Sequence, residues 1–386
     1  MKSCPALIRG TRQGAMRGLM TMGSALSMLV CLSWIAATPI ESYVDESGKD
    51  ELRGIHQDEP EAIIFMPLTM ANIQFSQMPL PRVVAKATAT ILATYTITPR
   101  AATPTPTTEP TEVPVPTSEL PWWGGYDEAV TDLASIEDLE SGYNSSQWYQ
   151  TLLDVLERRY AHGRYIVVEL ENSEQQAGFW VGGQTGSLDA LLGRLNVTVH
   201  EMDHQLGWQV GIVGTQLQSY AFVVRDDLTL FTPRMDTYPR SEIAQYLQGP
   251  LSNHYRSVYL EGRGSEQGVL SVLDEFNAYT HSLFTGYGIH DQTPPNQRQS
   301  HRDGLVTFMM YLQFYLRHAR TDHPDDYAKM RAEPELREAV KMLWARANFI
   351  LDLTEDIPSL SLDSEAVEAE MRKQDMQDEV QDFVLP

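Results

Sequence analysis

Cysteine is almost absent from this chain of 386 residues: its two cysteines, Cys4 and Cys31, both lie in the first 40 residues. The rest of the chain therefore forms no disulfide bond. It also offers no thiolate as a nucleophile or a metal ligand. Thiol peptidases and cysteine-type structural zinc sites are excluded, whereas a metal site made of histidine and carboxylate side chains is not.

Basic residues are also scarce. The chain has 29 Lys and Arg against 52 Asp and Glu, for a net charge of −23. So acidic a protein lacks the basic surface that nucleic-acid binding requires, and we expect no nucleic-acid partner. The sequence contains no P-loop, no dinucleotide-binding glycine pattern and no G-x-S-x-G elbow. These absences are consistent with metal chemistry.

The feature with the clearest chemistry is His200-Glu201-Met202-Asp203-His204, an H-E-x-x-H pattern. Residues four apart on an α-helix share one face, so His200 and His204 can bind a single metal ion. Glu201 then lies near a metal-bound water, where it can act as the general base of a hydrolase. The motif predicts a metallohydrolase, most readily a peptidase.

The sequence around the motif predicts the helix that this chemistry requires. Ser187 is an N-cap candidate and Gly207 a C-cap candidate. Apolar residues between them recur at steps of three and four, as in a helix packed on a core. They are Leu188, Leu191, Leu192, Leu195, Val199, Met202 and Leu206.

A catalytic zinc normally has three protein ligands, so one more is needed. The segment 269–283 predicts a second helix with one buried face, and Glu275 lies beside that face. With its H-E-x-x-H helix and the Glu-x-x-Ala-Tyr stretch from Glu275 to Tyr279, the chain resembles zinc peptidases of the gluzincin type. The resemblance covers two short helices. It implies Zn²⁺ held by His200, His204 and Glu275, with Glu201 as base.

The chain departs from the gluzincin pattern at one position. Many gluzincins carry an aspartate four residues after the ligand glutamate, where it orients a zinc-bound histidine; this position is Tyr279 here. Asp274 and Asn277 could replace that aspartate, but helical geometry places neither on the face of Glu275. The partner of the zinc-bound histidines is therefore unassigned, and such partners affect metal affinity.

Other residues remain open for the same roles. Glu266 and His281 are alternatives to Glu275 as the third ligand. A peptidase also needs a donor to stabilise the oxyanion of its tetrahedral intermediate. Tyr279 is the first candidate, being one turn from Glu275, and His281, His254 and His290 are alternatives.

The N-terminus predicts export. Four basic residues precede the apolar segment 19–37: Lys2, Arg9, Arg12 and Arg17. This is the arrangement of a secretory signal peptide, and the segment is also near the length of a single membrane anchor. We interpret residues 1–40 as one or the other. Both place the rest of the chain outside the cell, secreted or on the outer face of the membrane.

The exported part divides by composition. Residues 41–97 show no clear pattern. Residues 98–121 contain 7 Thr and 7 Pro, a composition typical of an extended linker. A globular catalytic domain is expected over 122–352, followed by an acidic tail over 353–386, which could form a loose helix over 364–380.

Within the domain we expect a zincin-like α+β fold: the motif helix, a backing sheet and a mainly helical C-terminal part. The helices are predicted over 147–161, 305–317 and 334–351, besides the two site helices. The strands are predicted over 164–170, 178–181, 209–213, 219–225 and 228–231, with a turn at Arg225-Asp226-Asp227.

Two functions fit this sequence. The first is an exported zinc metallopeptidase that cleaves peptide or protein substrates. The second is a non-catalytic binding or structural module displayed on a Thr/Pro stalk. The Trp122-Trp123 pair fits both, because aromatic residues serve cores and ligand surfaces alike.

Overall fold

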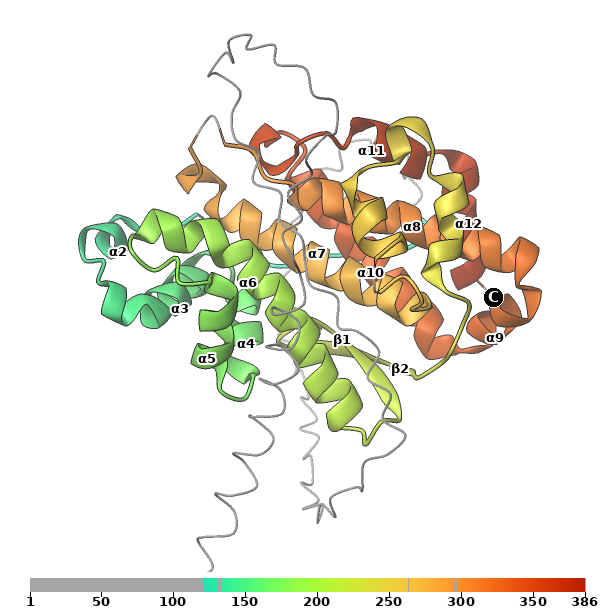
Figure 1. Ribbon diagram of the computed structural model, residues 1–386, viewed down its shortest axis with the longest axis horizontal. Helices are drawn as coiled ribbons and strands as arrows, with labels where there is room; N and C mark the ends of the chain where they lie inside the picture. Colours follow the sequence, from blue (N-terminus) through green and yellow to red (C-terminus); the bar gives the residue numbers. More distant parts are fainter. Residues whose placement is uncertain (1–120, 131–132, 263, 295–296, 386) are drawn as a thin grey trace, which may run out of the picture.

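The computed structural model describes residues 121–130, 133–262, 264–294 and 297–385. Over these residues the chain is mostly helical, with one antiparallel pair of strands (Figure 1). This agrees with the α+β class, although the sheet is smaller than expected. The predicted leader, the 41–97 segment and the Thr/Pro-rich linker up to residue 120 lie outside the described residues. No helix within the described ranges has both the length and the apolar composition of a membrane span.

Three long helices form the centre of the domain: α6 (Leu188–Trp208), α7 (Val269–Ile289) and α8 (His301–Asp322). Helix α7 packs against α6 and against α8, and it is buried on nearly all sides (Figure 1). A helix that is apolar and buried all round belongs to a core. The two helices expected to carry the metal ligands, α6 and α7, are therefore neighbours.

Helix α6 begins as predicted, with the Ser187 Oγ accepting a hydrogen bond from the Ala190 N–H at 3.2 Å. The predicted end at Gly207 is wrong. The helix continues to Trp208 and then into a π-helical turn, η2 (Gln209–Val213). A Cβ on Gly207 would lie 2.8 Å from the Ala221 carbonyl oxygen. Gly207 therefore does not end the helix; its lack of a side chain lets a strand approach closely.

Four helices precede the motif helix: α2 (Glu137–Ser141), α3 (Trp148–Arg159), α4 (Ala161–Glu169) and α5 (Ser173–Val181). Of these, α3, α4 and α5 pack against α6. The strands predicted over 164–170 and 178–181 are wrong, because both segments are helical. Ile166 and Val167 are buried on α4, and Ala177 and Val181 on α5, which both pack against α6. Tertiary packing here overrides the strand preference of the β-branched residues.

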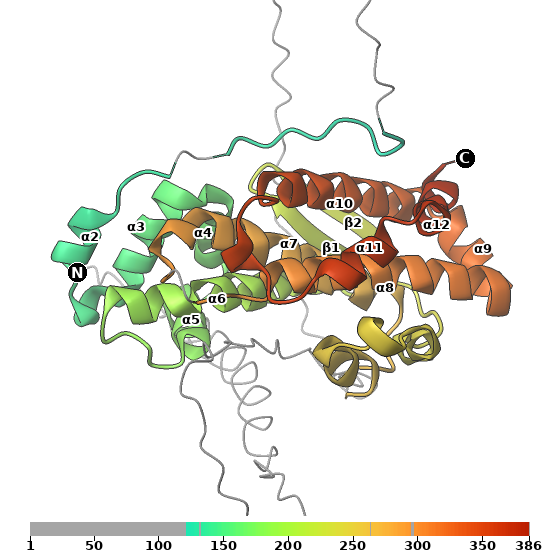
Figure 2. The same ribbon diagram turned by 90° about the horizontal axis from the view of Figure 1, so that it is seen from above.

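The hairpin of β1 (Ser219–Arg225) and β2 (Leu228–Pro233) confirms the last two predicted strands. Its register pairs Ala221 with Phe231 and Phe222 with Leu230. The strand predicted over 209–213 is wrong, since these residues form η2. In the view from above, the hairpin lies between α10 (Pro334–Leu353) on one side and α6 and α7 on the other (Figure 2).

The C-terminal part is helical, as expected. It contains α8, α9 (Pro324–Ala332), α10, α11 (Glu365–Met371) and α12 (Gln374–Val384). The acidic tail forms two short helices rather than one loose helix. Both pack on α8, with Met371, Met376 and Phe383 in the shared core. Short 3₁₀ or π turns complete the described fold: η1 (Ser145–Gln147), η3 (Arg240–Tyr246), η4 (Gly249–Leu251), η5 (Arg256–Leu260), η6 (His290–Gln292) and η7 (Pro358–Leu360).

Candidate metal centre

His200, His204 and Glu275 converge on one point between α6 and α7. These three residues are called the triad. The two Nε2 atoms of His200 and His204 are 3.2 Å apart. The Glu275 Oε2 lies 3.6 Å from the His200 Nε2 and 3.4 Å from the His204 Nε2. Ligand atoms about 2.0–2.2 Å from a tetrahedral zinc lie roughly 3.3–3.5 Å from one another, which matches these spacings.

The opposite ring nitrogens of both histidines have fixed partners. The Nδ1 of His200 lies 3.1 Å from the Ser282 Oγ, and the Nδ1 of His204 lies 2.8 Å from the Asp274 Oδ2. A metal-binding histidine usually has such a partner, which orients the ring. Of the two candidates for this role, Asp274 therefore reaches a histidine although it is not on the face of Glu275, whereas Asn277 donates to Asp203 instead. Asp274 lies on the partly exposed edge of α7. The ring of His204, one turn after His200 on α6, reaches the Asp274 carboxylate there.

The triad has the electrostatics of a cation site. Glu275 is fully buried, and neither of its carboxylate oxygens has a hydrogen-bond partner. Burial by itself raises the pKa of Glu275, but His204 and His200 outweigh it and hold the pKa below its usual range. Burial lowers the pKa of His200. Burial by itself lowers the pKa of His204 as well, but Asp274 and Glu275 outweigh it and raise this pKa well above its usual range. The buried carboxylate therefore needs a positive charge at this point, which a protonated His204 or a bound cation would supply.

The two predicted catalytic residues lie next to the triad. Glu201 is 2% exposed on α6. Burial raises the pKa of Tyr259 and of Tyr279, and the charge of Glu201 adds a smaller contribution to each. The Tyr279 ring stands edge-on to His200 with centroids 4.6 Å apart, and its hydroxyl is 3.0 Å from that of Tyr259. Tyr279 therefore supports the ring of His200.

A cavity of about 290 Å³ opens at the triad, and His204, Asp274 and Glu275 form part of its wall. The tyrosine on this wall is Tyr220 of β1. Burial raises the pKa of Tyr220 well above its usual range, and the adjacent Asp274 carboxylate raises it further, so its hydroxyl keeps its proton. Tyr220 gave no signal in the sequence. It reaches the site because Gly207 lets β1 approach α6.

The structure places the alternative residues elsewhere. Glu266 lines the cavity but is not part of the triad. Both ring nitrogens of His281 are occupied, Nε2 by the Val223 carbonyl at 2.7 Å and Nδ1 by the Tyr160 hydroxyl. His290 binds the Tyr287 carbonyl oxygen through Nδ1. His254 lies against the ring of Tyr255 and is not among the residues that line the cavity.

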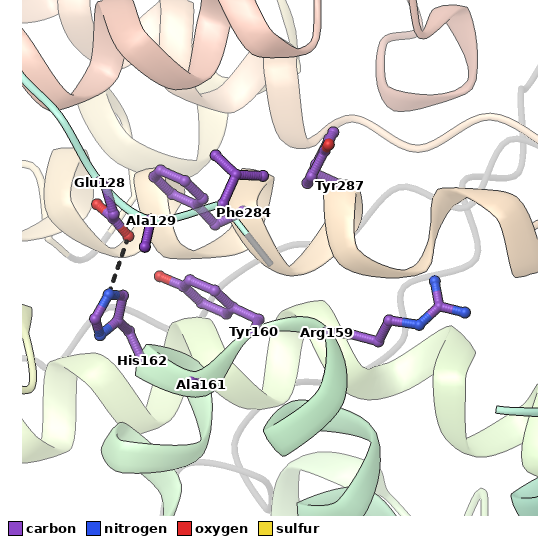
Figure 3. Close-up of a pocket in the computed structure, with 9 residues that line it drawn as sticks. Glu128, Ala129, Arg159, Tyr160, Ala161, His162, Phe284 and Tyr287 are labelled. Carbon is purple, nitrogen blue, oxygen red and sulfur yellow. Dashed lines mark ion pairs between the residues drawn. The ribbon is translucent and has the colours of Figure 1, made fainter. Parts of the chain in front are cut away.

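A second, smaller cavity of about 30 Å³ lies between the segment around Glu128, the α3–α4 junction and α7. Figure 3 shows Glu128 facing His162 across it, with Tyr160 and Phe284 alongside; the Glu128–His162 pair is 3.5 Å long. The space is large enough for water only. Its residues are not among the described groups that could hold a metal, and we assign the chemistry to the larger cavity.

Comparisons with protein-family models, curated proteins and solved structures found no match for this chain.

Proposed function

We propose that this protein is a zinc-dependent peptidase of the gluzincin type, with His200, His204 and Glu275 as metal ligands. The observation that carries the proposal is the buried Glu275 carboxylate, whose Oε2 lies 3.6 Å from the His200 Nε2 and 3.4 Å from the His204 Nε2. Two imidazoles and a carboxylate that leave a fourth position open are typical of a catalytic zinc.

Bound zinc polarises a carbonyl group as a Lewis acid and lowers the pKa of water to near neutrality. In the proposed reaction Glu201 accepts the proton of the attacking water and passes it to the leaving amine. The protonated Tyr220 hydroxyl, on the cavity wall, donates a hydrogen bond to the oxygen on which negative charge develops. Tyr279 holds the ring of His200 in place.

The residues around the large cavity also support the proposal that the substrate is a peptide. The wall of this cavity is lined by residues 234–237 after β2 and 266–268 before α7. Asp236, Glu266 and Asp274 stand against a single cation, Arg234. We therefore propose that the site prefers neutral or basic side chains over acidic ones, because an acidic side chain would be repelled.

The proposal is tested by zinc content and by hydrolysis of a mixed peptide library. The full chain is purified and dialysed without chelator, and zinc is measured by elemental mass spectrometry. We expect His204→Ala to contain one zinc equivalent less than the wild type and to lose hydrolysis. The matched control is His290→Ala, which removes a histidine outside the site. A folded His204→Ala variant with wild-type zinc content refutes the proposed ligand set.

Asp274→Ala is expected to weaken zinc binding about 10–100-fold, because the His204 Nδ1 loses the carboxylate that orients the ring. Competition with a zinc-binding dye measures the affinity. Asp236→Ala is the control, since Asp236 lies on the same cavity wall without touching either histidine. Equal affinities of the two variants would remove Asp274 from this role.

A further inference from the structure

A second group of metal-binding side chains lies outside the proposed catalytic site. Glu242 belongs to η3, His318 to the last turns of α8, and His323 to the junction between α8 and α9. The Glu242 Oε2 lies 3.2 Å from the His318 Nε2 and 2.9 Å from the His323 Nε2. All three donor atoms fall within 4.8 Å of one another.

The hydrogen bonds of His318 direct its Nε2 toward this point. Its Nδ1 lies 3.0 Å from the Asp322 Oδ2 and 3.0 Å from the Tyr246 hydroxyl. When the Nδ1 proton of neutral His318 is donated to Asp322, Nε2 is the ring nitrogen that can bind a cation beside the Glu242 carboxylate. The same pairing of carboxylate and histidine orients the ligands of known metal sites.

Aromatic rings fix the positions of both imidazoles. The Tyr238 ring stacks on His323 with centroids 4.3 Å apart and planes 4° from parallel. It also meets His318 edge-on at 5.3 Å, and Tyr246 meets His318 at 5.7 Å. His318 is buried, whereas Glu242 and His323 are partly exposed. The donors are therefore held in place by packing and open to solvent on one side, which gives an ion a route of entry.

The donor set selects the class of ion. Two imidazoles and one carboxylate suit zinc and related transition-metal ions, whereas calcium and magnesium require a shell of oxygen ligands. The observed spacings of 2.9 and 3.2 Å are slightly shorter than the roughly 3.3 Å between ligands of a tetrahedral zinc. A few tenths of an ångström of movement at the partly exposed Glu242 and His323 would bring these two spacings to that value.

We propose that Glu242, His318 and His323 form a second divalent transition-metal site, which zinc can fill. The ion would join η3 to the α8–α9 junction. It would also hold Tyr238, whose backbone N–H donates to the Asp326 carboxylate at 2.9 Å. Residues 234–237, directly before Tyr238, line the large cavity. The second ion is thus a structural clamp on the segment that forms the cavity wall.

The test removes the first site. In the full chain, His200→Ala and His204→Ala are combined, and zinc binding is measured by calorimetry and elemental mass spectrometry. We expect this double variant to bind one zinc equivalent. Adding Glu242→Gln, or separately His323→Ala, should abolish that binding. Adding His290→Ala is the matched control and should preserve it. Co²⁺ in place of zinc should give visible absorption bands that disappear with the same substitutions.

A folded double variant that binds no zinc overturns this proposal, and so does zinc that persists after both Glu242→Gln and His323→Ala. If the double variant does not fold, Glu242→Gln in the otherwise unchanged chain should reduce the zinc content by one equivalent, and an unchanged content overturns the site. The measurement is independent of peptidase activity. Loss of zinc by His204→Ala without hydrolysis by the wild type would refute the proposed function and leave this site standing.

Discussion

Glu201→Gln is expected to reduce peptide hydrolysis by roughly 10²–10⁴-fold while leaving the zinc content unchanged. The amide has the shape of the carboxylate, so it fits a position that is only 2% exposed. It cannot accept a proton from the attacking water, and the proposed general base is lost. The three proposed ligands are untouched, so the metal stays. Steady-state turnover of the preferred library peptide and elemental mass spectrometry of the same sample measure both effects.

Glu266→Gln is the matched control for Glu201→Gln. Glu266 also lines the large cavity, and it lies outside the triad. Its variant should keep turnover close to that of the wild type, apart from changes in substrate preference. Wild-type turnover by a zinc-loaded Glu201→Gln protein would rule out Glu201 as the base. Absence of hydrolysis by the wild type itself, with zinc present, would favour a binding module with a structural ion.

The shared position of the two histidines could be predicted because their spacing is helical. The four-residue spacing of His200 and His204 sets them on one face of α6 whatever surrounds them. Glu275 was predicted from the resemblance to gluzincins, and in the structure its carboxylate lies beside both histidines. Asp274 was one of two candidates for the partner of a zinc-bound histidine, but helical geometry alone placed it off the face of Glu275. A side chain next to a helix face can still meet a ring that extends from a neighbouring helix.

Helices were predicted correctly where apolar residues recur at helical spacing over a long segment. They were missed where the apolar segment is short. The segments 164–170 and 178–181 are rich in residues that favour strands, and each is short enough to fit either structure. Packing against α6 made them helical. Gly207 was interpreted as a helix end, since its proximity to Ala221 depends on a strand that follows later in the chain. That proximity brings Tyr220 to the cavity.

Contacts between distant segments were beyond prediction. Arg346 of α10 forms a bidentate ion pair with Glu128, which is 218 residues earlier in the chain, at 2.8 and 3.1 Å. Neither residue stands in a pattern that the sequence shows. The pair is also connected to α7, because Arg346 donates to the Tyr160 hydroxyl at 3.0 Å and Tyr160 is hydrogen-bonded to His281 of α7.

Arg346→Met should destabilise the domain by about 3–5 kcal/mol, the cost of leaving a buried charge without its partner. The Arg346 side chain is 0% exposed and that of Glu128 is 1% exposed. Urea unfolding followed by circular dichroism measures the change. Combining Arg346→Met with Glu128→Gln should recover part of the loss, since the amide carries no charge. Arg158→Met, which breaks the exposed pair with Asp138, is the control and should change stability little.

The same pair predicts a dependence on pH. Burial by itself raises the pKa of Glu128, but Arg346 outweighs it and holds the pKa below its usual range. A carboxyl whose pKa is lower in the folded state stabilises the fold above its unfolded-state pKa, and this contribution disappears as the pH falls through the folded-state value. The wild type should therefore lose more stability between pH 7 and acid pH than the Arg346→Met, Glu128→Gln double variant. Parallel pH profiles of the two proteins would show that Glu128 is not ionised in the fold, and the Arg346→Met loss would then come from packing alone.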